Sequence, residues 1–440
     1  MSVASPAVPP TRKHLSTWQQ AVMSFFWFAT NAHWTAILLV TLPSQIKSAV
    51  GNDTKGSALG LALGIGAFIS MLASPVFGAL SDRIKLPGGR RKPWVVIGTL
   101  GNIVSLFGLA FLIKPGEPSS VTPWIIAFLF VQLFNNIATA PYSALIPDMV
   151  PAEQRGSASG WMGLMTMLGT FAGGLTGLFM DSMGGITPVY FVLMGLMLLG
   201  MLVTVFGVKE PEVVTTRPFV WDEFWRGLYS PFKHRDFTWV FLTRMLVTMG
   251  VYTVQEFLQY FMGDVVGAPF SLPGLGLVAD SPEAAVSFFI LPLLIGAIIS
   301  SITAGVLSDK FGRKVMVYIA GALMGVVALI YIFFHSFLLV VVTGIVFGLG
   351  YGAYESVDWA LASDVLPSMD DFAKDMGVWH IALVFPQVIA TPIAGVLLDN
   401  FQVVGKAQNI ANLGYTVIFS LAVVYFIFGT VFVKQIKGVR

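Results

Sequence analysis

The sequence contains no cysteine and few charged residues. Without cysteine, the chain can form no disulfide bond, no thiolate metal site and no thiol nucleophile. Charged residues make up only 11% of the 440 residues, whereas a soluble domain typically has about 25%. The net charge of +2 gives no electrostatic support for nucleic-acid binding. These absences argue against a chain that folds as several soluble domains.

Signatures of ATP hydrolysis, metal binding and secretion are also missing. There is no Gly-x-x-x-x-Gly-Lys-Ser/Thr motif to bind ATP phosphates, and the five histidines lack the spacing of metal ligands. Residues 1–18 lack the basic region, apolar core and cleavage site of a signal peptide. We therefore expect no enzyme, cofactor or metal site, and we expect the first apolar run to be retained as a membrane span.

Apolar residues, in contrast, are abundant and occur in long runs. Hydrophobic residues make up 56% of the chain, and a helix needs about 20 in succession to cross the hydrocarbon core of a bilayer. The sequence predicts an all-α integral membrane protein of the cell membrane with twelve transmembrane helices. The predicted spans are 18–42, 57–81, 93–113, 123–147, 157–180, 187–208, 237–262, 284–307, 314–334, 337–363, 375–398 and 411–433.

Lysine and arginine are distributed unevenly between the loops. Cytoplasmic loops of membrane proteins are enriched in these residues. With the N-terminus placed in the cytoplasm, only Lys47, Lys55, Lys114 and Lys406 of the 25 basic residues fall on the outer side, and Arg244 falls within a span. The sequence therefore predicts that both termini are cytoplasmic.

Two short segments recur half a chain length later. Gly78-Ala-Leu-Ser-Asp82-Arg83 is echoed by Gly305-Val-Leu-Ser-Asp309-Lys310, and residues 144–151 are echoed by residues 360–367. Internal duplication is typical of transporters that bind substrate between their repeats. We predict one six-helix bundle over residues 1–208 and a second over 237–440, joined by a cytoplasmic linker at 209–236.

The two longest loops differ in composition. Trp221, Phe224, Trp225 and Leu228 in the linker have helical spacing. This spacing indicates either a short amphipathic helix at the membrane interface or an ordinary linker with aromatic anchors. Residues 263–283 on the outer side are rich in glycine and proline, so we expect an irregular loop there.

The segment from Gly78 to Lys92 resembles the loop signature of the major facilitator superfamily, because Gly-x-x-x-Asp-Arg/Lys followed by Gly-Arg-Arg/Lys recurs in the second half. This resemblance implies the major facilitator fold, alternating access and a monomer. It also implies that ion pairs in these loops hold the cytoplasmic side closed. The implied gating residues are Gly78, Asp82, Arg83, Gly89, Arg90, Arg91, Gly305, Asp309, Gly312 and Arg313.

A narrower resemblance is to the glycoside–pentoside–hexuronide:cation symporters and sucrose-transporter-like proteins. It rests on residues 75–83 with 89–94, and on residues 141–151 followed by Gln154-Arg155-Gly156. It implies cation-coupled uptake of a sugar or glycoside. Sodium-coupled members of that family carry carboxylates within the second and fourth spans, but residues 57–81 and 123–147 contain none. We therefore expect H⁺ rather than Na⁺ as the coupling cation.

Five ionisable residues fall inside predicted spans, where a charge costs about 3 kcal/mol or more. These candidates for coupling are His33, Arg244, Glu256, Glu355 and Asp358. A rise of about 1.5 Å per residue places Arg244 and Asp358 at similar depths, so they can pair. Glu355 shares a helix face with Asp358, and two neighbouring acids repel each other. We predict that Glu355 carries the coupling proton while Arg244 keeps Asp358 ionised; the alternative is a salt bridge that serves packing alone.

Polar and aromatic residues in the spans are candidates for substrate binding. Gln132, Asn135 and Asn136 lie largely on one face of the fourth span, and amides in lipid need hydrogen-bonding partners. Sugar hydroxyls are suitable partners, and aromatic rings can stack on sugar faces. The alternative is hydrogen bonding between helices or, for tryptophan, anchoring at the membrane interface. The full candidate set is Gln132, Asn135, Asn136, Tyr142, Trp34, Tyr351 and Trp359.

The leading hypothesis is a secondary transporter that takes up a sugar or glycoside together with a proton, within a lipid bilayer. A second is proton-driven export of an amphipathic or cationic compound or a lipid, because an acidic, aromatic cavity would suit it equally. A third is a membrane sensor that transports nothing, although the chain offers no sizeable soluble domain for signalling.

Overall fold

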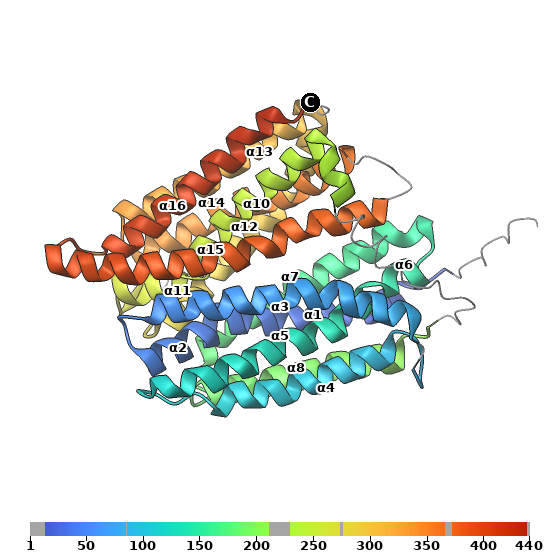
Figure 1. The fold of residues 1–440 in the computed structure, drawn as a ribbon, viewed down its shortest axis with the longest axis horizontal. Coiled ribbons are helices and arrows are strands. Elements are labelled where there is room, and N and C mark those ends of the chain that lie inside the picture. The colour runs from blue at the N-terminus through green and yellow to red at the C-terminus, as the bar shows by residue number, and fades with distance from the viewer. Residues whose placement is uncertain (1–13, 85, 211–228, 273–275, 366–371, 438–440) are drawn as a thin grey trace, which may run out of the picture.

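The structure, a computed structural model, describes residues 14–84, 86–210, 229–272, 276–365 and 372–437. Figure 1 shows a bundle of long helices that run between two ends of the molecule. Within the described ranges, twelve helical segments are long and apolar enough to cross a membrane, as predicted. They are Thr17–Val50, Lys55–Arg83, Lys92–Phe111, Pro118–Ser143, Arg155–Phe179, Ile186–Gly207, Arg235–Val266, Pro282–Phe311, Arg313–Phe333, Phe337–Ala362, Ile381–Gln408 and Leu413–Gln435.

The first six spans, called the first half below, come from the N-terminal part of the chain. Their elements are α1 (Thr17–Ala36), a π-helical turn (Ile37–Thr41), α2 (Leu42–Val50), α3 (Lys55–Arg83), α4 (Lys92–Phe111), a 3₁₀ turn (Pro118–Ser120), α5 (Val121–Ser143), α6 (Leu145–Met149), a 3₁₀ turn (Ala152–Gln154), α7 (Arg155–Phe179) and α8 (Ile186–Gly207). Helix α1 begins with a capping box, in which the Ser16 hydroxyl accepts from the Gln19 backbone N–H and the Gln19 side chain accepts from that of Ser16.

The last six spans form the second half. Their elements are a 3₁₀ turn (Ser230–Lys233), α10 (Arg235–Gln255), α11 (Leu258–Phe261), a π-helical turn (Met262–Val266), β1 (Phe270–Leu272), β2 (Leu277–Ala279), α12 (Pro282–Phe311), α13 (Arg313–Phe333), α14 (Phe337–Asp364), α15 (Phe372–Gln408), α16 (Leu413–Val431) and a 3₁₀ turn (Phe432–Gln435). The seventh span is interrupted at Glu256 and Phe257, between α10 and α11. The predicted aromatic segment of the linker, Trp221 to Leu228, lies outside the described residues, and the proposed division at 208 and 237 stays a prediction.

Helices pack mainly within each half. In the first half α1 packs on α7 and α8, and α5 packs on α3 and α4; in the second half α14 packs on α12 and α13, and α10 packs on α15 and α16. The most extensive contacts between the halves are those of α3 with α15 and of α7 with α12. Glycine makes both contacts close: a Cβ on Gly60 would lie 2.3 Å from the Thr391 carbonyl oxygen, and one on Gly177 would lie 2.2 Å from that of Glu283.

The two ends of the bundle differ. We call the end where α1 begins and α16 finishes the terminal end, and the end that carries α2, α11 and the β-strands the far end. In Figure 1 the halves approach each other at the far end, and their ribbons diverge toward the terminal end. The hydrogen bonds and ion pairs between halves that are described below all lie toward the far end. The cytoplasmic location of the termini stays a prediction.

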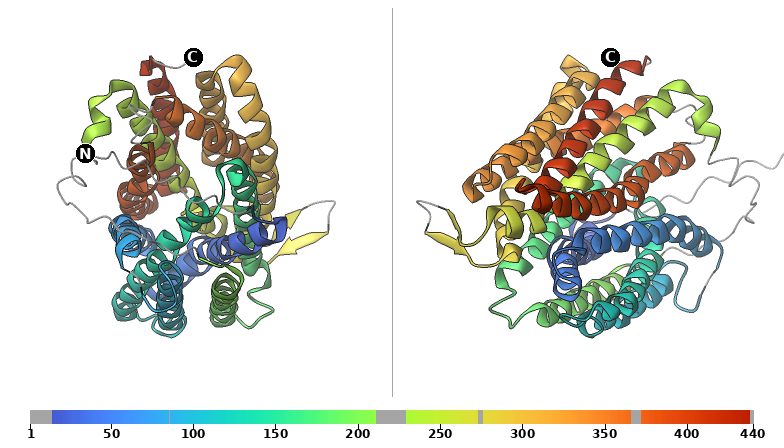
Figure 2. Two further views of the ribbon diagram at one scale, coloured as in Figure 1. Left: turned by 90° about the vertical axis from the view of Figure 1, so that its right-hand side faces the viewer. Right: turned by 60° about the vertical axis from the view of Figure 1, so that its left-hand side comes forward.

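The expectation of an irregular loop at 263–283 is wrong in part. Strands β1 and β2 pair antiparallel, with Phe270 opposite Ala279, and Figure 2 shows them projecting from the far end. Phe270 and Leu272 are buried while Ser271 between them is exposed, and the Phe270 ring packs on Phe337 at 5.3 Å between centroids. This alternation of period two is only three residues long, so neighbouring glycine and proline hide it in the sequence.

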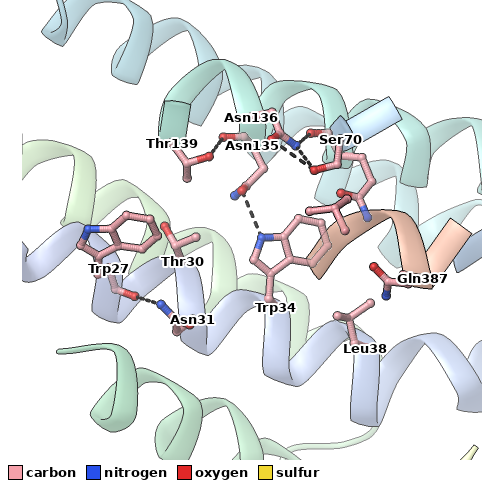
Figure 3. A pocket seen from close by; sticks show the side chains of 12 residues that line it. Trp27, Thr30, Asn31, Trp34, Leu38, Ser70, Asn135, Asn136, Thr139 and Gln387 are labelled. Carbon is pink, nitrogen blue, oxygen red and sulfur yellow. Dashed lines mark hydrogen bonds between the residues drawn. The ribbon is translucent and has the colours of Figure 1, made fainter. Parts of the chain in front are cut away.

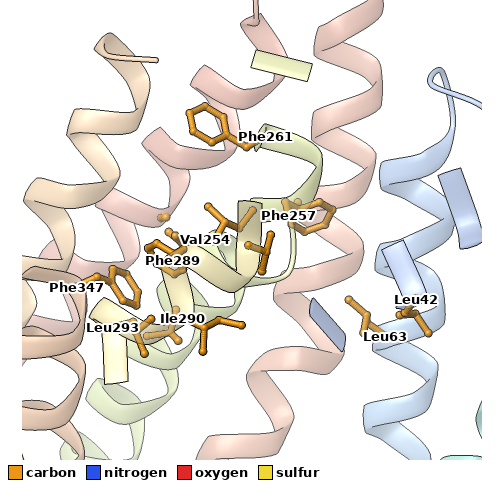
Figure 4. Packing of buried hydrophobic residues seen from close by; sticks show 14 of the residues in the cluster. Leu42, Leu63, Val254, Phe257, Phe261, Phe289, Ile290, Leu293 and Phe347 are labelled. Atoms are coloured by element: carbon orange, nitrogen blue, oxygen red, sulfur yellow. The ribbon is translucent and has the colours of Figure 1, made fainter. Parts of the chain in front are cut away.

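Apolar side chains fill the interior of each half and also cover its outside. Figure 4 shows Val254, Phe257 and Phe261 of the seventh span near Phe289 and Leu293 of α12 in one buried cluster. Outside, Phe206, Val104 and Ile302 are 80%, 73% and 68% exposed. Exposed apolar residues of this size on long helices are expected where lipid, not water, surrounds the protein.

Candidate functional site

A cavity of about 220 Å³ lies between α1, α3 and α5 of the first half and α15 of the second. Figure 3 shows polar side chains from several helices pointing into this central cavity. None of its lining residues is ionisable. They are Trp27, Thr30, Asn31, Trp34, Leu38, Ser70, Gln132, Asn135, Asn136, Thr139, Val384 and Gln387.

The polar wall of the central cavity follows from helical spacing on α5. Asn135 and Asn136 precede Thr139 by four and three residues, so both share a side of the helix with Thr139. Trp34 Nε1 donates to Asn135 Oδ1 at 3.1 Å, and Asn136 Nδ2 donates to Ser70 Oγ at 2.9 Å. These bonds fix the side chains of α1, α3 and α5 relative to one another.

Three polar atoms on the cavity wall lack a partner. Trp27 Nε1, Thr30 Oγ1 and Asn135 Nδ2 are buried and make no hydrogen bond within the described part of the chain. A buried polar group left without a partner costs about 1–3 kcal/mol. All three atoms are enclosed by neighbouring protein atoms, whereas the Gln132 amide, also without a described side-chain hydrogen bond, is not enclosed and can bond a ligand in the cavity.

The structure brings together some, but not all, of the predicted substrate residues. Trp34, Gln132, Asn135 and Asn136 line the central cavity. Tyr142 is buried beside it, where its hydroxyl donates to the Met23 carbonyl oxygen. Tyr351 and Trp359, both on α14, are not among the lining residues. The Trp359 side chain is 54% exposed and meets the Trp379 ring edge-on at 5.2 Å.

Gln387 of α15 is a lining residue that sequence reasoning missed. It follows Pro386 in a span whose other members are nearly all apolar. A single amide in such a span is a signal that could have identified it, because amides in lipid need a partner.

The predicted charged pair of the second half is in contact. Arg244 of α10 forms an ion pair with Asp358 of α14, and its guanidinium stacks 3.7 Å above the Trp379 ring centroid. Tyr354 donates to Asp358 Oδ1 at 3.2 Å. Arg244 and Asp358 are buried, whereas the Glu355 side chain is 35% exposed, with its Oε2 at 3.8 Å from Arg244 Nη2. Their role in coupling stays a prediction.

Glu256 and His33 lie apart from this cluster. Glu256, at the break between α10 and α11, accepts a hydrogen bond from Gln387 Nε2 at 3.1 Å, while its second oxygen has no partner in the described structure. Glu256 is therefore one hydrogen bond from the central cavity. His33 is fully buried in the first half, edge-on to Trp34 at 4.8 Å, and neither ring nitrogen is hydrogen-bonded among the described residues.

The predicted gating residues of the first half form an ion-pair cluster at the terminal end. Arg91 Nη2 bonds Asp82 Oδ1 at 2.5 Å, and Arg91 Nε bonds Asp148 Oδ2 at 3.1 Å. Glu210 accepts from the backbone N–H groups of Arg90, Arg91 and Lys92. Gly89 has a φ of +138°, and a Cβ there would lie 2.7 Å from the Glu210 carboxylate, so glycine is needed.

The second half repeats this layout. Arg313 bonds Asp309 at 3.3 Å, forms an ion pair with Asp364 and donates to Ser308 Oγ at 3.2 Å. Gly312, with a φ of +96°, turns the chain before Arg313 as Gly89 does before Arg90 and Arg91. In both clusters, the bonds described join helices of one half.

Polar contacts at the far end, in contrast, join the two halves. Asp264 forms an ion pair with buried Lys55 and accepts from the Tyr415 hydroxyl at 2.6 Å. Asp399 of α15 accepts from the backbone N–H groups of Gly56 and Ser57, at 2.9 and 2.6 Å. These are first-turn groups of α3, so a carboxylate of one half caps a helix of the other. Sequence reasoning did not find these contacts.

A third far-end contact lies in solvent. Lys406 Nζ donates to the Asp53 carboxylate at 2.7 Å, and both side chains are exposed. This hydrogen bond and the ammonium charge lower the pKa of Asp53 below its usual value.

Comparison with known proteins finds one family model along most of the chain. Residues 53–432 match the model described as MFS/sugar transport protein. The multi-drug resistance efflux pump PmrA of Streptococcus pneumoniae serotype 4 is 24% identical over 78% of this chain and 80% of its own length. The sucrose transport protein SUC4 of Arabidopsis thaliana is 27% identical over 26% of this chain and 24% of its own.

Solved structures with the same fold are also membrane transporters. The crystal structure of a bacterial homologue of the human lysosomal transporter Spinster superposes with a TM-score of 0.72 at 13% identity, covering 98% of each chain. At this identity the likeness concerns the fold. The relatives found by sequence and the structures found by fold are described as transporters and not as enzymes.

Proposed function

The chain belongs to the family of MFS/sugar transport proteins, and on this premise we propose that it carries a sugar or glycoside by proton-coupled symport. It is a multi-pass membrane transporter of the major facilitator fold. The proposal concerns its substrate class, its coupling cation and the residues that serve them.

The observation that carries the proposal is the chemistry of the central cavity. Its lining residues offer amides, hydroxyls and indole rings but no ionisable side chain. A cationic substrate would be desolvated there without a counter-ion, which is strongly unfavourable. Sugar oxygens can accept from the Gln132 amide, which makes no described side-chain hydrogen bond and is not among the enclosed atoms, and the indole faces of Trp27 and Trp34 can contact the apolar faces of a sugar ring.

Proton coupling is assigned to Glu355. Asp358 and Glu355 share one cation, Arg244, and Asp358 forms the direct ion pair. With Glu355 ionised the group of three carries one uncompensated negative charge, and with Glu355 protonated it is neutral. An uncompensated charge within the hydrocarbon costs about 3 kcal/mol or more. The partly exposed Glu355 can exchange its proton with water, whereas Asp358 is buried.

Export of a drug-like compound is the second candidate. It is favoured by the match to PmrA, a multi-drug resistance efflux pump, over most of both chains. The same residues would then couple proton entry to substrate exit, and the central cavity would have to accept an apolar or cationic molecule.

Transport by purified protein in proteoliposomes tests the proposal. Radiolabelled sucrose and lactose should accumulate when a proton gradient is imposed, and a sodium gradient should drive neither. Tetraphenylphosphonium, a lipophilic cation, should not be transported. Transport of tetraphenylphosphonium without transport of either sugar would favour the export candidate.

Glu355→Gln tests the coupling residue. This variant should lose proton-driven accumulation of sugar to the level of empty liposomes, yet retain exchange of labelled for unlabelled sugar, because substrate binding does not use Glu355. Glu117→Gln is a matched control, since Glu117 lies exposed in a loop beside Lys114. Undiminished proton-driven accumulation in Glu355→Gln would exclude Glu355 as the coupling group.

A further inference from the structure

Gln387 occupies a special place in the wall of the central cavity. Among the described lining residues, only Val384 and Gln387 come from the second half. Gln387 is therefore the polar group through which the second half can contact a substrate there. In Figure 3 its side chain extends from α15 toward Trp34 and Leu38 on the opposite wall.

The orientation of the Gln387 amide is set by Glu256. Gln387 Nε2 donates to Glu256 Oε1 at 3.1 Å, and both residues are buried. An ionised carboxylate only accepts hydrogen bonds, and a protonated one still accepts through its carbonyl oxygen. The amide nitrogen is thus held toward Glu256. The opposite atom, Gln387 Oε1, makes no described hydrogen bond and is not among the enclosed, unpartnered atoms, so it is open to the cavity.

We propose that Gln387 binds a substrate hydroxyl through its carbonyl oxygen, and that Glu256 is the positioning residue that holds the amide in this orientation. The proposal rests on the proposed function, because it requires a substrate rich in hydroxyl groups. It assigns Glu256 to substrate recognition, whereas proton coupling is assigned to Glu355.

The two walls of the central cavity then make complementary demands. The first half presents the Gln132 amide, which makes no described side-chain hydrogen bond and is not among the enclosed atoms, and its N–H groups require acceptors on the substrate. The second half presents an acceptor, Gln387 Oε1, which requires a donor. A hydroxyl group supplies both, so the cavity selects polyhydroxylated molecules over ethers and esters, which cannot donate.

Glu256 also stands between the cavity and the charged cluster. Glu256 caps the C-terminal end of α10, the helix that also carries Arg244. Substrate recognition and the charged cluster therefore share one helix. This places the positioning residue where recognition and coupling meet.

A double-mutant cycle tests the proposal. Binding of sucrose and lactose to the purified protein is measured by thermal shift for wild type, Gln387→Leu, Glu256→Leu and the double variant. Loss of one neutral hydrogen bond should weaken sugar binding about threefold to tenfold in Gln387→Leu. Glu256→Leu should weaken it similarly, but should cause no further loss in the Gln387→Leu background, because Glu256 acts through Gln387.

Two further variants separate positioning from a merely structural role. Glu256→Gln keeps an acceptor in the same place and should bind sugar nearly as wild type does. Gln402→Leu makes the same change on the same helix, away from the cavity, where Gln402 accepts from the Gly414 N–H; it should not alter sugar binding. If Glu256→Leu does not fold, Glu256→Met replaces it with a more adaptable apolar side chain.

The outcomes are distinct. Equal weakening by Glu256→Leu in both backgrounds, or wild-type binding by Gln387→Leu, would overturn the role of this pair while leaving sugar transport in place. Binding of tetraphenylphosphonium by wild type, with no response to either sugar, would reject the sugar assignment and this proposal with it.

Discussion

Charged side chains join the two halves at the far end, whereas at the terminal end they join helices within a half. Lys55 and Asp264 belong to different halves, and the Lys55 side chain is only 3% exposed. Arg91 and Asp82 belong to the same half, and the Asp82 side chain is 54% exposed. In this state the far-end contacts hold the halves together, and the terminal-end clusters maintain the shape of each half.

This difference changes how the loop signature is interpreted. The family resemblance implied that Asp82 and Asp309 hold the cytoplasmic side closed. Here their described partners, Arg91 and Arg313, lie in the same half, while the halves converge at the opposite end. A closing role for these clusters stays a prediction, and it belongs to a state in which the halves have rocked together at the terminal end.

The largest effect is expected at Asp264. Asp264→Ala removes the partner of buried Lys55, and breaking a buried ion pair costs about 3–5 kcal/mol. The far end should therefore open. Ser287→Cys, introduced into a chain without native cysteine, replaces a buried residue of α12 that donates to the Gly174 carbonyl oxygen of the other half. It should react much faster with a membrane-impermeant maleimide when combined with Asp264→Ala. The control is Asp181→Ala, which removes an exposed carboxylate two residues beyond the last residue of α7. It should leave the labelling rate unchanged.

Asp399→Ala should open the far end by a smaller amount. It removes the carboxylate that caps α3 from the other half, and loss of a helix cap costs about 0.5–2 kcal/mol. The closed population should fall about twofold to thirtyfold relative to the open one. The same labelling assay measures this shift, and a wild-type rate would show that the cap does not bias the two states.

Asp82→Asn tests the terminal end. Exposed ion pairs contribute about 0–1 kcal/mol, and Arg91 keeps its bond to Asp148, so the melting temperature should change little. Turnover should nevertheless fall if this cluster serves the other state of the cycle. Normal sugar turnover in Asp82→Asn would remove the cluster from the mechanism.

The smallest effect is expected at Asp53. Lys406 lowers the pKa of Asp53 in the folded protein, so any stabilisation is present above the pKa of the unfolded chain and is lost as pH falls through the lower, folded value. Because the pair is exposed and screened by salt, Asp53→Asn should melt as wild type does at neutral pH. A clear drop in melting temperature would show that even a solvated contact at the far end stabilises the folded protein.

Much of this molecule could be predicted from sequence because membranes impose simple constraints. The length of apolar runs identified the twelve spans, and similar depth along two helices identified the Arg244–Asp358 pair. The far-end contacts could not be found in this way. Lys55 and Asp399 lie at the ends of their spans, where ionisable residues are ordinary, and only the packing of α3 on α15 brings Asp399 to the first turn of α3.

The central cavity could be predicted only in part, because some of its lining residues are brought there by the packing of helices. The amide row on α5 has a helical period that can be counted, so Asn135 and Asn136 were found. Gln387 becomes a lining residue only because α15 crosses near the first half, and its orientation depends on Glu256 from another helix. Tyr351 and Trp359 have suitable chemistry, but the rotation of α14 places them elsewhere.

The glycines at the seam have one more consequence. A methyl group on Gly60 or Gly177 would collide with a carbonyl oxygen of the opposite half in this closed arrangement of the far end. Alternating access requires the halves to separate there, which would move that carbonyl oxygen away from the methyl group. The steric requirement for glycine at these two positions therefore applies in one part of the transport cycle. A substitution there can stop turnover even if it fits well in a state with the far end open.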